Sequence, residues 1–152
     1  MTMPAMREAE REDVAAIVAL LAADALGSQR EVPTDPLQPA YLAAFDAIAA
    51  DPNNGLWVAV SDGTIIGCYQ LTFLPGFSRL GSWRAQIEGV RVAASARGKG
   101  VGELMVRHAI ALAKGRGCKL MQLTTDKRRI DAHRFYGRLG FGATHEGMKL
   151  TL

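Results

Sequence analysis

The sequence has few cysteines and histidines, the residues that form disulfides and bind zinc. It contains two cysteines, Cys68 and Cys118, both in segments typical of strands, and three histidines. Two thiols at such positions are more typical of small buried apolar groups in a reducing compartment than of a disulfide. No grouping of His, Cys and Asp has the spacing of a metal site. The sequence therefore argues against a disulfide-stabilised secreted domain and predicts no bound metal.

Long apolar runs are also missing. No segment approaches the roughly 20 apolar residues that a membrane-spanning helix needs. The first residues lack the charged-then-apolar pattern of a secretory signal, and no repeat, low-complexity tract or long linker interrupts the chain. We therefore expect residues 1–152 to form a single domain in the cytoplasm, without a membrane partner.

Charge of one sign does not dominate, since the net charge is +3, but basic residues gather in one region. Between residues 97 and 129 there are nine basic and two acidic side chains. Such a region attracts phosphate groups, either those of a nucleic acid or those of a cofactor. No nucleic-acid-binding motif accompanies it, so a nucleic-acid partner is the less favoured interpretation.

A basic, glycine-rich turn opens this region, between a strand-like segment (83–92) and an apolar, helix-like segment (102–114). The turn consists of Arg97, Gly98, Lys99, Gly100, Val101 and Gly102. Glycines permit positive φ and the close approach of a ligand. Free N–H groups at a helix start, together with the helix dipole, favour an anion. The pattern therefore predicts a phosphate-bearing ligand.

Three phosphate-binding motifs can be compared with this turn. The P-loop, GxxxxGK[ST], fails because the lysine lies between glycines and no Ser or Thr follows it. The dinucleotide fingerprint, GxGxxG, fails because Glu103 stands where the third glycine should be. The pattern [RQ]-x-x-G-x-[GA], by contrast, fits residues 97–102.

With this turn and a second block, the chain resembles the N-acetyltransferases of the GNAT family over most of its length. The second block, DAHRFYGRLGF at residues 131–141, is similar to the family's A-x-x-F-Y-x-x-x-G-F segment. The two blocks occur in the family's order and at roughly its separation, so together they are more specific than either alone. A generic α/β turn without a ligand is the competing structural interpretation.

The resemblance implies an α/β fold, a single domain with a mixed, mostly antiparallel sheet and helices on both faces. Hydrophobic periodicity alone supports only one α/β domain. We predict strands at 6–9, 56–60, 64–74, 83–92, 119–124, 141–144 and 148–152, and helices at 10–26, 40–50, 102–114 and 131–139. Asp62-Gly63 predicts a hairpin turn, and Gly67 a β-bulge.

The resemblance also implies that the chain moves the acetyl group of acetyl-CoA to a primary amine of a small molecule or peptide, by direct attack in a ternary complex. An alkyl ammonium with a pKa of about 10 must first lose a proton. Glu88 is the predicted base, and Tyr136, at the family's F-Y position, is the predicted acid for the leaving thiolate. The competing structural interpretations are a surface carboxylate paired with Arg84 or Arg91, and a buried aromatic side chain.

The family's cofactor contacts carry over by position. The backbone of Val90 and Val92 would bind the pantetheine arm like an added strand, whereas sheet packing alone would explain their side chains. Backbone N–H groups of the turn, Arg97, Gly98, Lys99, Gly100, Val101 and Gly102, would hold the pyrophosphate. Arg129 stands where many family members carry Asn, seven residues before the tyrosine, and is predicted to contact a phosphate of the cofactor.

A non-catalytic acyl-CoA-binding regulatory module is the alternative function. It would tolerate the loss of both Glu88 and Tyr136 without losing CoA binding. The acceptor pocket is expected from residues 28–39, from residues 74–83 and from the end of the chain, and none of these segments carries diagnostic chemistry. A homodimer is possible because dimers are frequent in the family.

Overall fold

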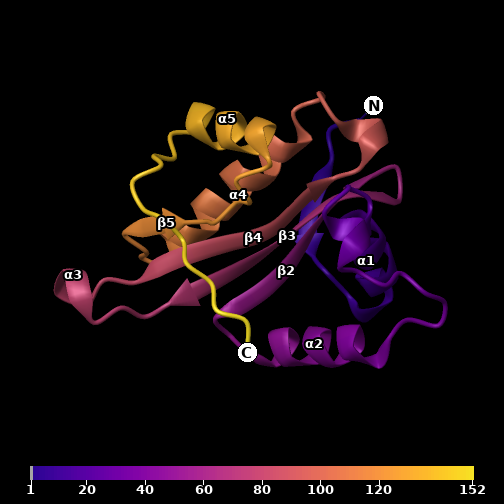
Figure 1. The fold of residues 1–152 in the computed structure, drawn as a ribbon, viewed down its shortest axis with the longest axis horizontal. Helices are drawn as coiled ribbons and strands as arrows, with labels where there is room; N and C mark the ends of the chain where they lie inside the picture. Colours follow the sequence, from indigo (N-terminus) through magenta and orange to yellow (C-terminus); the bar gives the residue numbers. More distant parts are fainter. Residues whose placement is uncertain (1) are drawn as a thin grey trace.

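A five-stranded sheet organises the computed structural model, which describes residues 2–152 (Figure 1). The strands, in spatial and chain order, are β1 (Ala5–Glu8), β2 (Asn54–Ser61), β3 (Thr64–Leu74), β4 (Arg84–Val92) and β5 (Leu120–Gln122). Strands β1 to β4 pair antiparallel, and β5 pairs parallel to β4. The predicted mixed, mostly antiparallel sheet is therefore confirmed.

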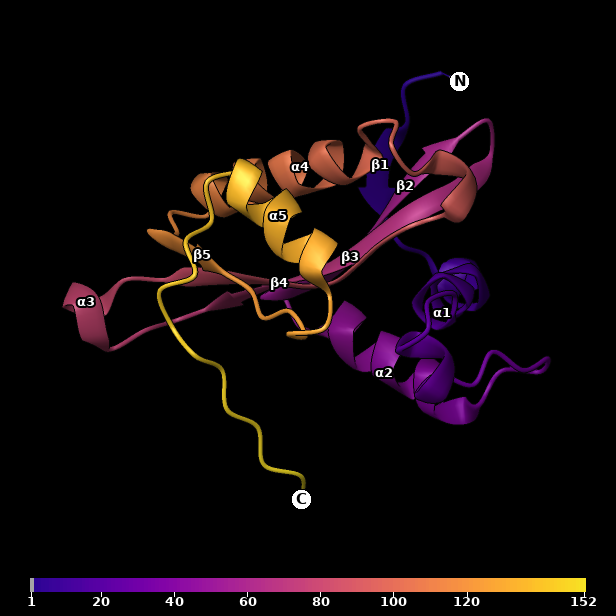
Figure 2. The ribbon, with the colours of Figure 1, turned by 45° about the horizontal axis from the view of Figure 1, so that its top comes forward.

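Helices cover both faces of this sheet, as predicted (Figure 2). They are α1 (Val14–Ala22), α2 (Pro39–Ala50), α3 (Ser78–Gly81), α4 (Val101–Gly115) and α5 (Ile130–Arg138). Figure 2 shows α4 and α5 over one face and α1 and α2 over the other, while α3 is a single turn at the tip of the β3–β4 connection. Among residues 2–152, no helix is long and apolar enough to cross a membrane.

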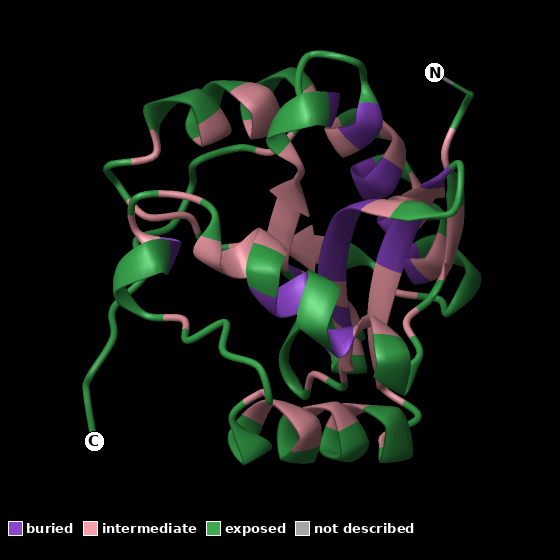
Figure 3. Ribbon diagram, turned by 90° about the vertical axis from the view of Figure 1, so that its right-hand side faces the viewer, coloured by how far each residue is buried: buried purple, intermediate pink, exposed green. Residues whose placement is uncertain are grey.

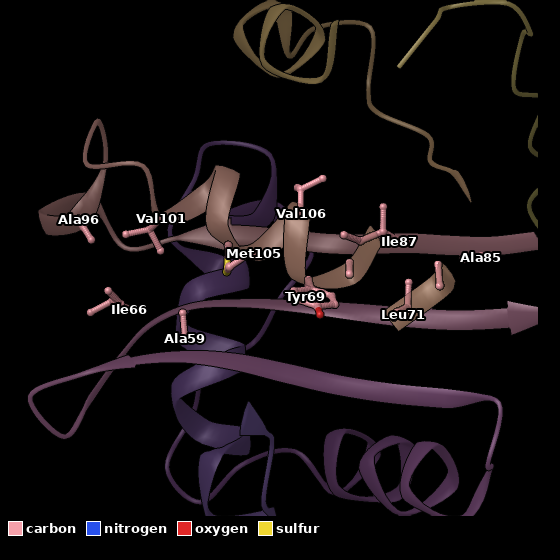
Figure 4. Packing of buried hydrophobic residues seen from close by; sticks show 12 residues of the cluster. Ala59, Ile66, Tyr69, Leu71, Ala85, Ile87, Ala96, Val101, Met105 and Val106 are labelled. Atoms are coloured by element: carbon pink, nitrogen blue, oxygen red, sulfur yellow. The ribbon is translucent and has the colours of Figure 1, made fainter. Parts of the chain in front are cut away.

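The main core lies between the sheet and α4 (Figure 4). Tyr69 and Leu71 from β3 and Ile87 from β4 pack there with Met105 and Val106 from α4, and none of these residues is more than 1% exposed. Burying each such side chain stabilises the fold by about 1.5–3 kcal/mol. Figure 3 shows most buried segments in the middle of the sheet and in the helix beside it. This packed core fixes the positions of the strand ends, from which the loops start.

The predicted helix at 10–26 is longer than the observed one, because α1 covers only Val14–Ala22. The residues before it, 11–13, and the residues 27–29 after it form short 3₁₀ turns. The Asp24 carboxylate accepts a hydrogen bond from the N–H of Gly27 at 2.7 Å, and such side-chain bonds compete with the helical backbone pattern. An apolar stripe therefore marked the face of this helix but not its end.

The two predicted C-terminal strands, 141–144 and 148–152, are wrong. Neither segment pairs with the sheet, and Figure 2 shows this part of the chain leaving the body of the molecule. Met148, Leu150 and Leu152 are 95%, 85% and 112% exposed. Their alternation predicts an extended backbone, but a strand also needs a neighbour, and pairing depends on residues far away in the sequence.

Candidate active site

The predicted phosphate turn joins β4 to α4 and leaves its backbone accessible. Gly98 and Gly100 have φ of +73° and +79°, and a Cβ at either position would meet no heavy atom within 4 Å. Gly100 is the N-cap of α4 and provides no side-chain cap, so the first N–H groups of the helix stay available. Lys99 Nζ donates to the carbonyl of Ser95 at 2.8 Å, and Arg97 is exposed. This arrangement suits an anion such as pyrophosphate.

The last two residues of the motif have a packing role. Val101 is 2% exposed, so only its backbone can face a ligand. A Cβ on Gly102 would lie 3.2 Å from the ring of Phe135 and 3.7 Å from Val92. The small residue therefore lets α5 approach the start of α4 and the end of β4 closely.

A β-bulge shapes β4 just before the turn. Gln70 of β3 is paired with Glu88, and Cys68 with Arg91, so β4 advances three residues where β3 advances two. Gly89 lies within the bulge and has φ of +62°. Because of the extra residue, Ile87 and Val90 both pack in the core between the sheet and α4. The side chains of Glu88 and Arg91 therefore lie on the opposite face of the sheet.

The pairing between β4 and β5 ends early. The last paired residues are Gln86 and Gln122, although β4 continues to Val92. Beyond this point the β4 edge that faces away from β3 has no strand partner in the part of the chain that the structure describes. Residues 87–92, including Val90 and Val92, thus lie at an edge without a neighbouring strand, beside α5, although the Val90 carbonyl accepts a hydrogen bond from Arg91 Nη1 at 2.9 Å. An added strand or a peptide-like ligand requires such an edge.

Glu88 lies exposed on the face of β4 opposite α4. Its carboxylate accepts a hydrogen bond from Gln86 Nε2 at 3.4 Å. The alternative to a catalytic role was a surface carboxylate paired with Arg84 or Arg91. Within residues 2–152, Glu88 forms an ion pair with neither arginine. The carboxylate is therefore accessible to a molecule that approaches from solvent.

Tyr136 lies half-buried on α5, between two other aromatic rings. Its ring centroid is 5.0 Å from that of Phe135 and 5.7 Å from that of Phe141. Burial raises the pKa of the phenol, and the nearby positive charges of Arg91 and Arg129 only partly oppose this shift. The phenol therefore keeps its proton at neutral pH, as a proton donor must.

Sequence analysis missed a cluster of charged residues next to these groups. Arg129, directly before α5, forms an ion pair with Asp24, beyond the end of α1. Burial and the charge of Arg129 lower the pKa of Arg91, and the charges of Asp24 and Arg30 also act on it. Arg91 between the apolar residues Val90 and Val92 was the one signal available, but its partners come from distant parts of the sequence.

Other reactive side chains belong to the core. Tyr69 Oη lies 2.7 Å from Nδ1 of His108, which also packs edge-on against Trp57. Burial raises the pKa of the Cys68 thiol to about 12, so this cysteine is a poor nucleophile.

Two surface hollows, of about 110 and 230 Å³, lie elsewhere on the molecule. The larger one is lined partly by Leu112 and Arg116, at the end of α4 away from the glycine turn. None of the predicted site residues lines either hollow.

A sequence model of the acetyltransferase (GNAT) family matches residues 17–141. The chain belongs to this family. The match covers both the glycine turn and the block around Tyr136, so the predicted family and the enzyme class, an acyltransferase, are confirmed.

Two relatives of this GNAT chain are named for small-molecule acceptors. The chain is 30% identical over 106 residues to aminoalkylphosphonate N-acetyltransferase of Salmonella typhimurium, and the aligned region covers 70% of this chain and 68% of that enzyme. It is also 32% identical over 90 residues to glucosamine 6-phosphate N-acetyltransferase of Trypanosoma brucei brucei, and this aligned region covers 59% of each chain. The chain thus spans about three-fifths of the second enzyme's length.

A solved structure matches the whole fold. A protein from Bacillus halodurans C-125 described as a transcriptional regulator is 50% identical, with a TM-score of 0.96 over 98% of this chain and 99% of that one. Together with the family match, this likeness over the whole chain confirms the predicted GNAT fold.

Proposed function

We propose that this GNAT chain transfers the acetyl group of acetyl-CoA to a primary amine of a small molecule or peptide, by direct attack of the amine while both substrates are bound. The observation that supports this proposal is the free edge of β4, which leads directly into an uncapped, glycine-rich helix start. The free edge suits the amide groups of a pantetheine arm, and the turn suits a pyrophosphate.

The residues of the turn and of β4 fit this cosubstrate. In the proposal, the backbone of Val90 and Val92 pairs with the pantetheine amides, and the N–H groups of residues 97–102 bind the pyrophosphate. Acetyl-CoA itself supplies the acetyl group as a thioester. The predicted contact of Arg129 with a cofactor phosphate is an alternative to a role in binding the acceptor, because its partner in the structure is Asp24, close to Arg91.

Three groups around the free edge would assist the transfer. Glu88 accepts a proton from the acceptor ammonium, directly or through water. The N–H of Val90 polarises the thioester carbonyl. Tyr136 donates its proton to the CoA thiolate as it leaves.

Calorimetric titration with acetyl-CoA, CoA and NAD tests the binding step. We expect micromolar affinity for acetyl-CoA and no heat with NAD. An assay of thiol release with a panel of amines then tests catalysis, and we expect kcat to fall by about 10²-fold or more in Glu88→Gln and in Tyr136→Phe. Absence of acetyl-CoA binding would overturn the proposal.

The second candidate is a non-catalytic acyl-CoA-binding regulatory module, which the description of the Bacillus halodurans protein favours. This candidate predicts acetyl-CoA binding without turnover of any amine. It also predicts that Glu88→Gln and Tyr136→Phe bind acetyl-CoA as the unchanged chain does. Turnover of even one amine, sensitive to either substitution, would decide for the transferase.

We also propose that two copies of the chain form a homodimer through their C-terminal segments. Met148, Leu150 and Leu152 alternate with polar residues, as in a half-buried strand, yet all three are exposed in one copy. The outer edge of β5 has no partner strand among the described residues. A strand from a second copy at that edge would bury these side chains and satisfy their backbone groups.

A further inference from the structure

Three arginines and one aspartate, from β4 and from the segments beside α1 and α5, lie close enough for their charges to interact. The Arg129–Asp24 ion pair connects the loop before α5 with the end of α1. Arg91 and Arg30 lie close enough for their charges to interact with each other. With three positive charges and one negative charge, the cluster has an excess of two positive charges.

Asp24 cannot neutralise this excess. Its carboxylate already accepts the N–H of Gly27 at 2.7 Å and pairs with Arg129. Burial alone would raise the pKa of the Asp24 carboxyl, but that hydrogen bond and the charges of Arg91 and Arg129 lower it overall. Asp24 is therefore ionised and fully engaged, and two guanidinium groups remain without a matching anion.

Arg91 is the member that most needs a partner. Its Nη1 donates to the carbonyl of Val90 at 2.9 Å, but its Nε is buried and has no hydrogen-bond partner in the described chain. Leaving a buried donor of a charged group unpaired is costly, so such groups usually have a partner. An anion bound between Arg91 and Arg129 would neutralise the excess positive charge of this cluster.

The cluster lies beside the candidate reaction centre. The bulge at Gly89 puts Arg91 on the same face of β4 as Glu88. The charges of Arg91 and Arg129 also act on the Tyr136 phenol. An anion held here would therefore lie beside an amine that reacts between Glu88 and Tyr136.

We propose that the acceptor is a small amine that also carries an anionic group, and that Arg91 and Arg129, supported by Arg30, bind this anion. The shared chemistry is that of a phosphonate, phosphate or carboxylate. This inference rests on the proposed acetyl transfer. The glycine turn for the cofactor's pyrophosphate leads into α4 over one face of the sheet, whereas Arg91 lies on the opposite face of β4. The arginine cluster is therefore a subsite separate from the turn.

Acceptors that differ in their anionic group test the subsite. We expect a KM at least tenfold lower for 2-aminoethylphosphonate or β-alanine than for propylamine, because only the first two can pair with the arginines. The comparison of phosphonate with carboxylate identifies the preferred anion. Equal KM values for all three amines would overturn the inference and leave the transferase proposal intact.

Substitutions then assign the residues. Arg91→Gln should raise the KM for the anionic amines about 10- to 100-fold, with the KM for propylamine and for acetyl-CoA unchanged, and Arg91→Lys should restore part of the loss. Arg107→Gln, on the exposed side of α4, is the matched control for the loss of one charge.

Arg129→Gln serves as a second variant if Arg91→Gln does not fold. A rise in the KM for acetyl-CoA alone would instead make Arg129 a cofactor contact and overturn its place in the subsite.

Calorimetric titration with methylphosphonate separates this inference from the proposed function, since it needs no turnover. Saturable binding to the unchanged chain that is lost in Arg91→Gln supports the subsite even if no amine is acetylated. Equal binding, or none, in both proteins would overturn it.

Discussion

One backbone conformation at the start of α4 has consequences for both stability and ligand binding. Gly100 has φ of +79°, where a residue with a Cβ is strained by about 1–2 kcal/mol. We predict that Gly100→Ala lowers the free energy of unfolding by about this amount and weakens acetyl-CoA binding several-fold, because the strained turn would shift its N–H groups. Urea unfolding and calorimetry measure the two effects.

Gly115→Ala is the control for this substitution. Gly115 ends α4 and has no neighbour within 4 Å of an added Cβ. Since alanine favours the helix, the control should leave acetyl-CoA binding unchanged and should stabilise the fold by up to about 1 kcal/mol. If both variants bind acetyl-CoA equally well, the turn does not hold the pyrophosphate.

The Tyr136 hydroxyl can be removed without disturbing the aromatic stack around it. We predict that Tyr136→Phe keeps the packing with Phe135 and Phe141, changes stability by less than about 1 kcal/mol, and lowers kcat about 10²-fold. Because burial raises the pKa of the phenol above its usual value of 10.0, the active protonated form persists to higher pH. The rate of the unchanged chain should therefore show no loss from this group below about pH 10.

The pH profile of kcat for both proteins provides the measurement. An unchanged kcat in Tyr136→Phe would remove the proposed acid. A fall in the rate of the unchanged chain near pH 8 that disappears in the variant would contradict the raised pKa.

At the scale of elements, an ion pair ties β1 to the turn before α1. Arg7 donates to both carboxylate oxygens of Asp13, at 2.6 and 3.0 Å. These hydrogen bonds lower the pKa of Asp13 below its usual 3.8, although burial opposes them. The stability from the pair is therefore present above about pH 4 and is lost as the pH falls through the lowered pKa.

We predict that Asp13→Asn lowers the free energy of unfolding by about 1–2 kcal/mol at pH 7, and that the difference from the unchanged chain shrinks below pH 4. The value allows for the 40% exposure of Arg7. Urea unfolding between pH 2 and pH 7 measures the difference. Asp46→Asn, which breaks the exposed pair with Arg11, is the control and should cost less than about 1 kcal/mol. If the loss of unfolding free energy in Asp13→Asn were the same at every pH, the charge of Asp13 would not contribute to stability.

At the scale of the whole molecule, the exposed C-terminal segment predicts association. We expect light scattering to give the mass of a dimer, and Leu150→Lys to give a monomer, because a charge on the apolar side of the segment cannot be buried at the interface. Thr151→Lys, on the polar side of the same segment, is the control and should remain dimeric. A monomeric unchanged chain would overturn the proposed homodimer.

The sequence by itself determined the features that depend on neighbouring residues. The bounds of β3, the helix after the glycine turn and the turn residues were predicted closely, because hydrophobic periodicity and glycine positions act locally. The family followed from two short motifs for the same reason.

Only the tertiary structure decided how distant segments meet. It separated the C-terminal segment from the sheet, placed Glu88 and Arg91 on one face through the bulge at Gly89, and brought Arg91, Arg129 and Asp24 together. Strand pairing, register and charge clusters depend on residues far apart along the chain, so a local pattern of side chains does not specify them.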